Sequence, residues 1–326
     1  MNVNTHAAVD NECDCHWRGA GTRTDNCIGQ SVTNPLVDEG GAEGCVEYPI
    51  VLVGHDCSLR SASARLYAER VASSHLSSVR TGSPADAPPI ALLHGFTQTA
   101  GCWGPFADKL SATHSVVAID LPGHGGSDEV RADLEQTTSL VASSIERSIV
   151  IGYSLGGRIA LHLALGHPQL VERLVVIGAT GGLDSEEERA KRRVADESLA
   201  DHLEDIGVDA FLDEWLSQPM FASLTADQSF RELRATNSAA GLASSLRLCG
   251  TGTQESLWSR LGELTMPVLV IAGANDEKFT HLGHRLVESI GTNASIQLID
   301  NAGHSAQLEN PTATASVITK WLSETL

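Results

Sequence analysis

The segment Gly152-Tyr153-Ser154-Leu155-Gly156 places a serine between two glycines, a pattern used in nucleophilic and base catalysis. Alone, a G-x-S-x-G match is a weak signal, because it often arises by chance. Here an apolar run precedes the motif and a helical pattern follows it, which is the strand–turn–helix context of a nucleophile elbow. The tight turn needs glycines and exposes the serine hydroxyl above a sheet. The pattern therefore predicts Ser154 as a catalytic residue.

An acid and a histidine follow Ser154 in the chain order that such a site requires, which is serine, acid, histidine. Asp276 comes just after the apolar run 267–273, and His304 comes just after the run 295–300. A serine hydroxyl needs an imidazole to take its proton, and a carboxylate usually orients that imidazole. Three suitable residue types at the ends of expected strands therefore predict the triad Ser154, Asp276 and His304.

Backbone N–H groups must stabilise the negative charge that develops during such a reaction. We expect these donors to be Leu155, directly after the serine, and Phe96, in the loop after the run 88–95. His94 is an alternative base, but its place two residues before a predicted donor favours a role in shaping the loop. Asp120 also ends an expected strand, but it precedes the serine and fits the required order less well.

The elements that position these residues alternate between strand and helix patterns, which indicates a parallel sheet covered on both faces. A leading antiparallel hairpin is expected within 64–70 and 75–82. The expected sheet strands are short apolar runs that end in Gly-rich or Pro-rich loops, and they lie within 88–95, 115–125, 148–154, 172–180, 266–276 and 294–304. We predict an α/β fold, mostly parallel, whose core comprises residues 64–182 and 265–326.

Residues 183–264 interrupt this alternation, because they show helical patterns and no strand candidate. They are expected to form a helical lid inserted after the sixth strand. Ligands of open α/β sheets bind at the carboxyl ends of the strands, so this position favours a lid over a plain surface excursion. Residues 1–63 show no sustained periodicity and are expected to form a loosely ordered extension.

Composition narrows the class of partner. The chain has 326 residues and a formal net charge of −19 at pH 7, which argues against a nucleic-acid partner. No apolar run is long enough for a membrane span, and the first residues do not resemble a secretory signal, so we expect a cytoplasmic protein. Five of the seven cysteines precede residue 60 and are expected to be incidental thiols rather than zinc ligands: Cys13, Cys15, Cys27, Cys45 and Cys57.

Over residues 64–326 the sequence resembles the α/β-hydrolase superfamily. Within it, the chain resembles the family of 2-succinyl-6-hydroxy-2,4-cyclohexadiene-1-carboxylate (SHCHC) synthases of menaquinone biosynthesis. The resemblance rests on "LHGFTQTAGCWGPF", "DLPGHGGS", "GYSLGGRIALHLAL", "GATGGL", "DEWLSQPMF" and "AGHSAQLENP". The arginine after the elbow, the W-x-x-Q-P-x-F pattern and the spaced arginines of 183–264 discriminate most. Residues 1–63 have no counterpart in the family pattern.

The resemblance implies a small polyanionic substrate bound by arginines. Arg158 lies one helical turn after Ser154 and would hold a carboxylate with its planar guanidinium. Arg192 and Arg234 match positions of further substrate-binding arginines, although Arg189 or Arg193 could replace Arg192. The alternative for each arginine is a surface pair with nearby acids. The resemblance also implies that the pocket walls include Tyr153 and Trp215.

The resemblance further implies a lyase that eliminates pyruvate from 2-succinyl-5-enolpyruvyl-6-hydroxy-3-cyclohexene-1-carboxylate. Ser154 would then act as a general base and would form no acyl-enzyme. No metal or organic cofactor is called for, and we expect a monomer or a weak homo-oligomer. One alternative is a serine hydrolase of esters or of carbon–carbon bonds in vinylogous diketones, which needs no arginine cluster. Another is a non-catalytic binding protein, against which the complete triad argues.

Overall fold

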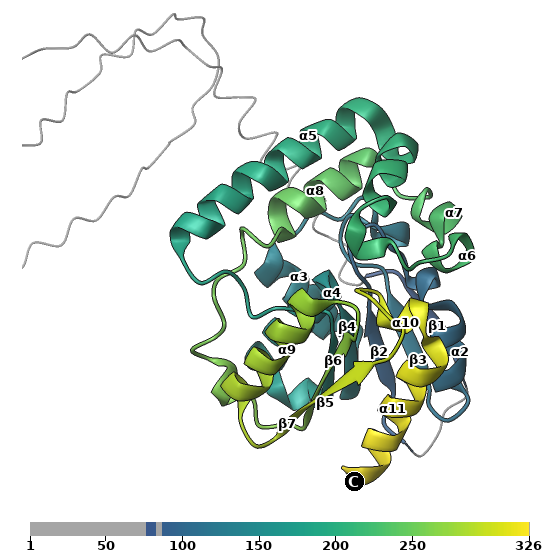
Figure 1. Cartoon of the computed structure of the whole chain (residues 1–326), viewed down its shortest axis with the longest axis vertical. Helices are drawn as coiled ribbons and strands as arrows, with labels where there is room; N and C mark the ends of the chain where they lie inside the picture. Colours follow the sequence, from purple (N-terminus) through teal and green to yellow (C-terminus); the bar gives the residue numbers. More distant parts are fainter. Residues whose placement is uncertain (1–75, 83–86, 326) are drawn as a thin grey trace, which may run out of the picture. The chain divides into compact units, whose positions relative to one another are not determined.

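The computed structural model describes residues 76–82 and 87–325, and these contain a seven-stranded sheet (Figure 1). The strand order is β1-β3-β2-β4-β5-β6-β7, and only β1 runs antiparallel to its neighbour. The strands are β1 (Ser78–Thr81), β2 (Ile90–Leu93), β3 (Val116–Ile119), β4 (Ser148–Tyr153), β5 (Val171–Ile177), β6 (Val268–Gly273) and β7 (Ala294–Ile299). The prediction of a mostly parallel α/β sheet is confirmed.

The leading hairpin stays a prediction, because its first segment lies outside the described residues. Its second segment contains β1, which pairs antiparallel with β3, whereas the expected partner at 64–70 lies outside the described residues. Among the described strands, the helical segment (residues 183–264) therefore follows the fifth strand, β5. The predicted extension 1–63, with its five cysteines, also lies outside the described residues.

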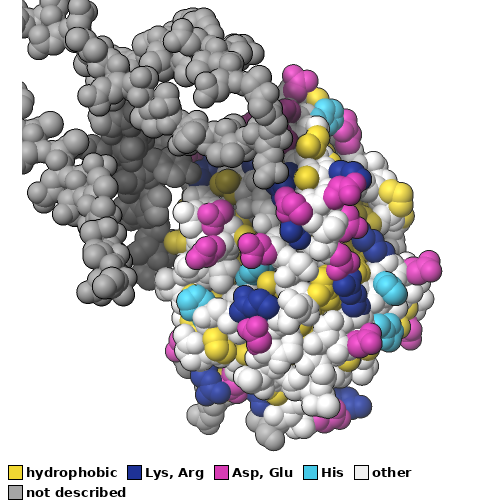
Figure 2. Space-filling view, turned by 90° about the vertical axis from the view of Figure 1, so that its left-hand side faces the viewer, with side chains coloured by type: hydrophobic (Ala, Val, Ile, Leu, Met, Phe, Trp, Pro, Cys, Tyr) yellow, Lys and Arg dark blue, Asp and Glu magenta, His cyan; other side chains and the backbone are white. Residues whose placement is uncertain are grey.

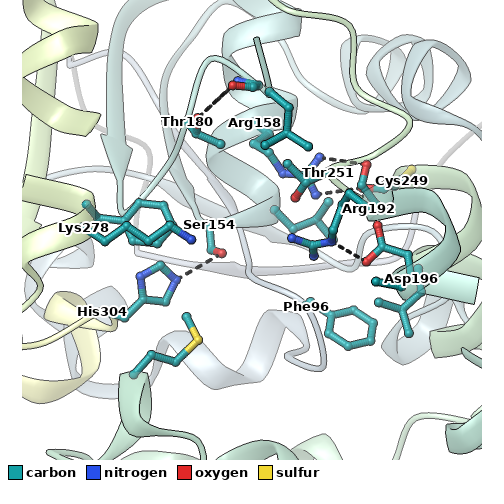
Figure 3. Close-up of a pocket in the computed structure, with 18 of the residues that line it drawn as sticks. Phe96, Ser154, Arg158, Thr180, Arg192, Asp196, Cys249, Thr251, Lys278 and His304 are labelled. Atoms are coloured by element: carbon teal, nitrogen blue, oxygen red, sulfur yellow. Dashed lines mark hydrogen bonds and ion pairs between the residues drawn. The ribbon is translucent and has the colours of Figure 1, made fainter. Parts of the chain in front are cut away.

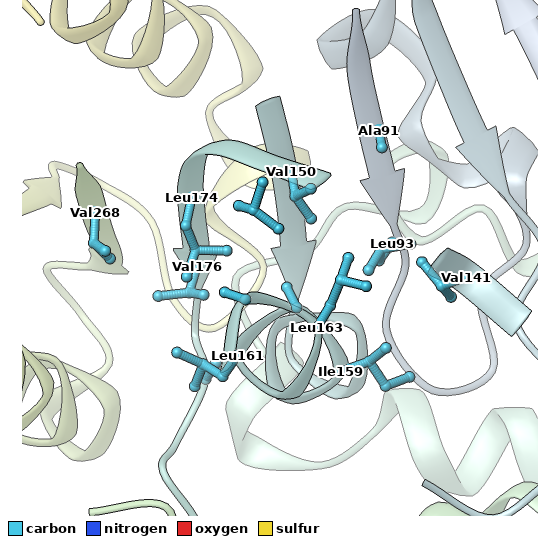
Figure 4. Close-up of a cluster of buried hydrophobic side chains, with 14 of the residues drawn as sticks. Ala91, Leu93, Val141, Val150, Ile159, Leu161, Leu163, Leu174, Val176 and Val268 are labelled. Atoms are coloured by element: carbon cyan, nitrogen blue, oxygen red, sulfur yellow. The ribbon is translucent and has the colours of Figure 1, made fainter. Parts of the chain in front are cut away.

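Helices cover both faces of the sheet because alternate strand residues point to opposite sides. Leu93, Val150 and Val176 join one apolar cluster, which packs against the helix that follows Ser154 (Figure 4). Leu92 and Ile151 join the other cluster. The core helices are α2 (Gly104–Ser111), α3 (Leu134–Ser144), α4 (Leu155–Gly166), α9 (Glu277–Ile290), α10 (Ala306–Glu309) and α11 (Pro311–Glu324). Burial of each large apolar side chain stabilises the fold by about 1.5–3 kcal/mol.

The helical segment lies beyond the carboxyl ends of the central strands (Figure 1). It contains α5 (Glu186–Leu216), α6 (Ala226–Ser229), α7 (Arg231–Arg234) and α8 (Ala239–Cys249). α5 bends at Gly207, whose φ of +79° side-chain-bearing residues rarely adopt. A small core holds α5 against α8 and includes Leu203, Phe211 and Leu242. The 3₁₀ turns in the described residues are Ala100–Trp103, Gly125–Ser127, Pro168–Leu170, Pro219–Phe221 and Leu261–Glu263.

The described residues contain neither a helix that could span a membrane nor a cluster of metal-ligating side chains. No helix in this part of the chain is long and apolar enough to cross a membrane. Within the same ranges, no group of three or more His, Cys, Asp or Glu side chains could hold a metal ion. On the described part of the face shown in Figure 2, acidic and basic side chains are interspersed, with no continuous basic area.

Candidate active site

Ser154 lies at a strained turn between β4 and α4, with φ at +51°. The neighbouring glycines make this turn possible. A Cβ on Gly156 would lie 1.9 Å from the Leu93 carbonyl oxygen, and one on Gly152 would lie 2.3 Å from the Gly156 carbonyl oxygen. Both obstacles are backbone atoms, so larger residues could not be accommodated by side-chain movement. The motif is therefore the tight turn expected of a nucleophile elbow.

The three predicted triad residues meet at the carboxyl edge of the sheet. His304 Nδ1 lies 3.0 Å from Asp276 Oδ2, and His304 Nε2 lies 3.3 Å from Ser154 Oγ (Figure 3). An ionised carboxylate only accepts hydrogen bonds, so Nδ1 carries the proton and Nε2 is left to accept one from the serine. The geometry therefore suits proton removal from Ser154.

The carboxylate of Asp276 is held in its charged form. Burial by itself would raise the pKa of Asp276, but the hydrogen bonds from His304 and from the Phe279 amide outweigh burial and lower the pKa. Aromatic rings enclose the imidazole, since the Phe279 and His304 centroids are 4.4 Å apart and Phe221 of the helical segment lies at 6.2 Å. His304 is 3% exposed, so little water competes with its hydrogen bonds.

The two predicted oxyanion donors line the same cavity as Ser154. Within the described ranges, neither the Phe96 amide nor the Leu155 amide donates a hydrogen bond, so both are available to a ligand. Gly156 N–H donates to the His94 carbonyl oxygen at 3.0 Å, which fixes the distance between the two donor loops. The arrangement can therefore stabilise a developing oxyanion.

His94 and Asp120, the alternatives considered from the sequence, hold loops together. His94 is fully buried and accepts a hydrogen bond from Leu121 N–H at Nε2, 3.0 Å away. Burial lowers the pKa of His94 to about 4, so the ring is neutral at physiological pH. Asp120 accepts hydrogen bonds from the Ala100 and Gly126 amides at 2.7 and 2.9 Å. Neither side chain takes part in the hydrogen bonds of the triad.

A cavity of about 660 Å³ lies between the sheet edge and the helical segment and includes Ser154 and His304. Its walls hold more cations than acids, although the whole chain is strongly acidic. The cationic side chains are Arg158, Arg192, Arg234, Lys278 and Arg285. The acidic ones are Asp184, Glu188 and Asp196. A cavity of this size and local charge suits a small anionic ligand.

Arg158 is the clearest of these cations. It is 7% exposed and donates hydrogen bonds to the Cys249 carbonyl oxygen at 2.7 Å and to Gln254 Oε1 at 3.4 Å. Burial lowers its pKa to about 10, so it remains charged at neutral pH. No carboxylate among the described residues lies within ion-pair distance of it. The charge of Asp196 raises the pKa of Arg158 from a distance, but a buried cation without a direct ion pair is costly, and a ligand carboxylate would offset that cost.

Arg234 is 1% exposed and bonds to the loop that carries Phe96. Its guanidinium donates to the Thr97 hydroxyl and to the Phe96 carbonyl oxygen. Its second terminal nitrogen has no partner among the described residues. Burial lowers the pKa of Arg234. Arg234 thus combines a loop-holding role with a buried donor that has no partner among the described residues.

Arg192 is the one of the three adjacent arginines that faces the cavity. Arg189 and Arg193 do not line it, and both bond to Glu186. Arg192 also has an acidic partner, because its Nε lies 2.7 Å from Asp196 Oδ1. Arg192 therefore lines the cavity and also forms an ion pair within its own helix.

Tyr153 and Trp215 line the cavity, as the resemblance implies. The Tyr153 hydroxyl bonds to Ser305 Oγ at 2.7 Å, and burial raises the pKa of Tyr153. Trp215 packs edge-on against Phe96, with centroids 5.2 Å apart, and its indole N–H has no partner among the described residues. Trp215 therefore contributes an aromatic wall and carries a buried donor that has no partner among the described residues.

Sequence reasoning missed two residues. Lys278 lines the cavity beside the triad, but a lysine near a helix start looks like an ordinary surface residue. Glu309 accepts hydrogen bonds from the Gly303 and Ser305 amides, on either side of His304, at 2.6 and 2.9 Å. It also bonds to the Ser223 hydroxyl of the helical segment. Ser223 and Glu309 are far apart in the sequence, and no sequence pattern indicates that they are in contact.

Comparisons with known proteins show which family the chain resembles in sequence and in fold. Residues 90–317 match the family model described as Alpha/beta hydrolase family. A SHCHC synthase of Photorhabdus laumondii is 34% identical over 73% of this chain and 86% of its own length. A SHCHC synthase of Salmonella heidelberg is 36% identical over 71% and 91%. MenH from S. aureus has a TM-score of 0.70 and 28% identity, with coverage of 77% of this chain and 98% of that one.

The chain belongs to the α/β-hydrolase family. Within it, the two curated relatives place the chain in the SHCHC synthase family. An enol-lactonase from Burkholderia xenovorans has a TM-score of 0.63 at 24% identity and shares the fold alone.

Proposed function

We propose that this enzyme eliminates pyruvate from 2-succinyl-5-enolpyruvyl-6-hydroxy-3-cyclohexene-1-carboxylate to give SHCHC, a step of menaquinone biosynthesis. The observation that carries the proposal is Arg158, a buried cation without an acidic partner among the described residues, on the wall that also holds Ser154. An ordinary esterase does not require a fixed cation there, whereas a substrate with several carboxylates does. The names of the relatives support the same reaction.

In this proposal Ser154 acts as a general base. It takes the proton from the ring carbon that bears the succinyl group, while His304 receives the serine proton and Asp276 stabilises the imidazolium. The electron pair moves through the ring double bond, and the bond between the ring carbon and the enolpyruvyl oxygen breaks. Pyruvate leaves as its enolate and is then protonated on carbon.

The remaining site residues bind the substrate and stabilise charge. The Phe96 and Leu155 amides would stabilise the negative charge that develops on the succinyl carbonyl oxygen. Arg158 and Arg234 would each bind a carboxylate, and Arg192 would contribute while it stays paired with Asp196. Tyr153 and Trp215 would form the walls. The reaction as written requires no metal or organic cofactor.

Pyruvate release from the enolpyruvyl substrate tests the proposal, followed through NADH consumption by coupled lactate dehydrogenase. We expect saturable release by the wild type, a fall of about a thousandfold or more with Ser154→Ala, and little hydrolysis of a nitrophenyl ester. Rapid ester hydrolysis without pyruvate release would refute the lyase and favour a serine hydrolase.

A further inference from the structure

The cations of the cavity lie on two sides of Ser154. Figure 3 shows Arg158 and Arg192 on one side and Lys278 on the other, where its side chain points into the cavity toward Ser154. Lys278 is the second residue of α9, two positions after Asp276. The substrate of the proposed reaction carries three carboxylates, on its succinyl, ring and enolpyruvyl parts. Cations on both sides of the serine would match such a spread of charge.

Lys278 is an exposed residue that lines the cavity next to Phe279. Its Nζ is 5.2 Å from the centroid of the Phe279 ring, and that ring packs against the His304 imidazole. The charge of Lys278 also contributes to lowering the pKa of Asp276. An ammonium at this position therefore acts electrostatically on the triad region as well as on the cavity.

The ammonium of Lys278 has no acidic partner in the described part of the chain, since no carboxylate lies within 4.0 Å of Nζ. Arg285, on the same helix, also lines the cavity, but it differs in this respect. Its guanidinium donates to both oxygens of Asp184, at 2.6 and 2.9 Å, and its Cζ lies 3.8 Å from the centroid of the Trp258 ring. On the α9 side of the cavity, Lys278 is thus the described cation that remains available to a ligand.

We propose that Lys278 binds the enolpyruvyl carboxylate and stabilises the pyruvate enolate as it leaves. The inference rests on the function proposed above and deepens it by assigning one carboxylate to one residue. When the ring C–O bond breaks, its electron pair stays on the enolpyruvyl oxygen, next to the existing carboxylate. A compact ammonium with three donors can contact both oxygens as the negative charge grows between them.

The product SHCHC serves as the control for which carboxylate Lys278 binds. It keeps the succinyl and ring carboxylates but lacks the enolpyruvyl group. The experiment measures kcat/KM for pyruvate release and the inhibition constant of SHCHC for the wild type, Lys278→Met, Lys278→Arg and Lys109→Met. Lys109 is on α2, does not line the cavity and serves as a matched surface control. Fluorophosphonate labelling of Ser154 checks that each variant keeps its triad intact.

We expect Lys278→Met to lower kcat/KM by roughly 10- to 100-fold while the SHCHC inhibition constant stays within about twofold. Lys278→Arg should recover part of the loss, and Lys109→Met should match the wild type. An unchanged kcat/KM in Lys278→Met, or an SHCHC inhibition constant that rises by the same factor, would overturn the assignment. Absence of pyruvate release from the wild type would refute the underlying function as well.

Discussion

The two walls of the cavity are built differently. On the sheet side, close packing of the backbone fixes the position of Ser154, because Gly156 contacts the neighbouring strand β2. On the helical side, the partly exposed Arg192 is held by an ion pair to the buried carboxylate of Asp196. The backbone of the sheet edge therefore fixes the reacting groups, whereas the ligand-binding cations come from both walls, with Arg158 on the sheet side and Arg192 on the helical side.

The largest expected effect comes from filling the space at the elbow. Gly156→Val should destabilise the fold by about 3 kcal/mol or more and abolish activity, because its Cβ would overlap the Leu93 carbonyl. Gly166→Ala, in the last turn of the same helix, is the matched control, since a Cβ there meets nothing within 4 Å. Urea unfolding measures both variants. A Gly156→Val protein as stable as the control would contradict the rigid elbow.

Removing Arg158 should separate stability from function. Arg158→Met should lower kcat/KM for pyruvate release by about 100-fold, mainly through KM, because a carboxylate loses its partner. Its free energy of unfolding should change by less than about 2 kcal/mol, because removal of a buried cation offsets the loss of the hydrogen bonds to the Cys249 carbonyl and Gln254. Steady-state kinetics and urea unfolding on the same preparation test both parts. Intact turnover would instead favour a general hydrolase.

Acid should destabilise the sheet-edge loops. Burial lowers the pKa of His94 to about 4 and that of His124 to about 3, whereas both are near 6.5 in an unfolded chain. Below pH 6.5 the unfolded chain binds protons that the folded rings exclude, so stability falls as pH decreases. Between pH 7 and pH 5 the loss should be about 2 kcal/mol per histidine. Urea unfolding at both pH values measures this loss. Equal free energies of unfolding at pH 7 and pH 5 would contradict the prediction that the buried rings stay neutral.

A smaller effect is expected where the two walls meet. Glu309→Gln should lower kcat by about tenfold, because an amide cannot accept from both backbone N–H groups and also from Ser223. Ser223→Ala breaks only the contact to the helical segment and should change kcat by less than twofold. The rate of fluorophosphonate labelling of Ser154 reports whether His304 is still oriented. Equal kinetics in the two variants would show that Glu309 does not position the histidine.

The sheet-side residues could be predicted because their signals are local. Ser154, Asp276 and His304 each follow an apolar strand, and parallel strands bring their carboxyl ends together. Arg192 was harder to choose, because Arg189 and Arg193 share its helix and only tertiary packing decides which one faces the cavity. No sequence pattern predicts a role for Lys278. That role depends on the absence of a nearby acid among the described residues rather than on its neighbours in sequence.

The order of the elements shows the same limit. The parallel strands could be read from their apolar runs, whereas the pairing of β1 with β3 is a long-range contact that the sequence pattern of a hairpin did not reveal. The prediction that the helical segment follows the sixth strand counts a first hairpin strand, and that strand lies outside the described residues. Its boundaries at 183 and 264 stay predictions.

The central claim is that Ser154 removes a proton and is not acylated. The most direct measurement compares kcat for the enolpyruvyl substrate carrying hydrogen or deuterium on the ring carbon that bears the succinyl group, with mass spectrometry of the enzyme during turnover. The account predicts a primary isotope effect and an enzyme of unchanged mass. An acyl adduct on Ser154 without an isotope effect would contradict it.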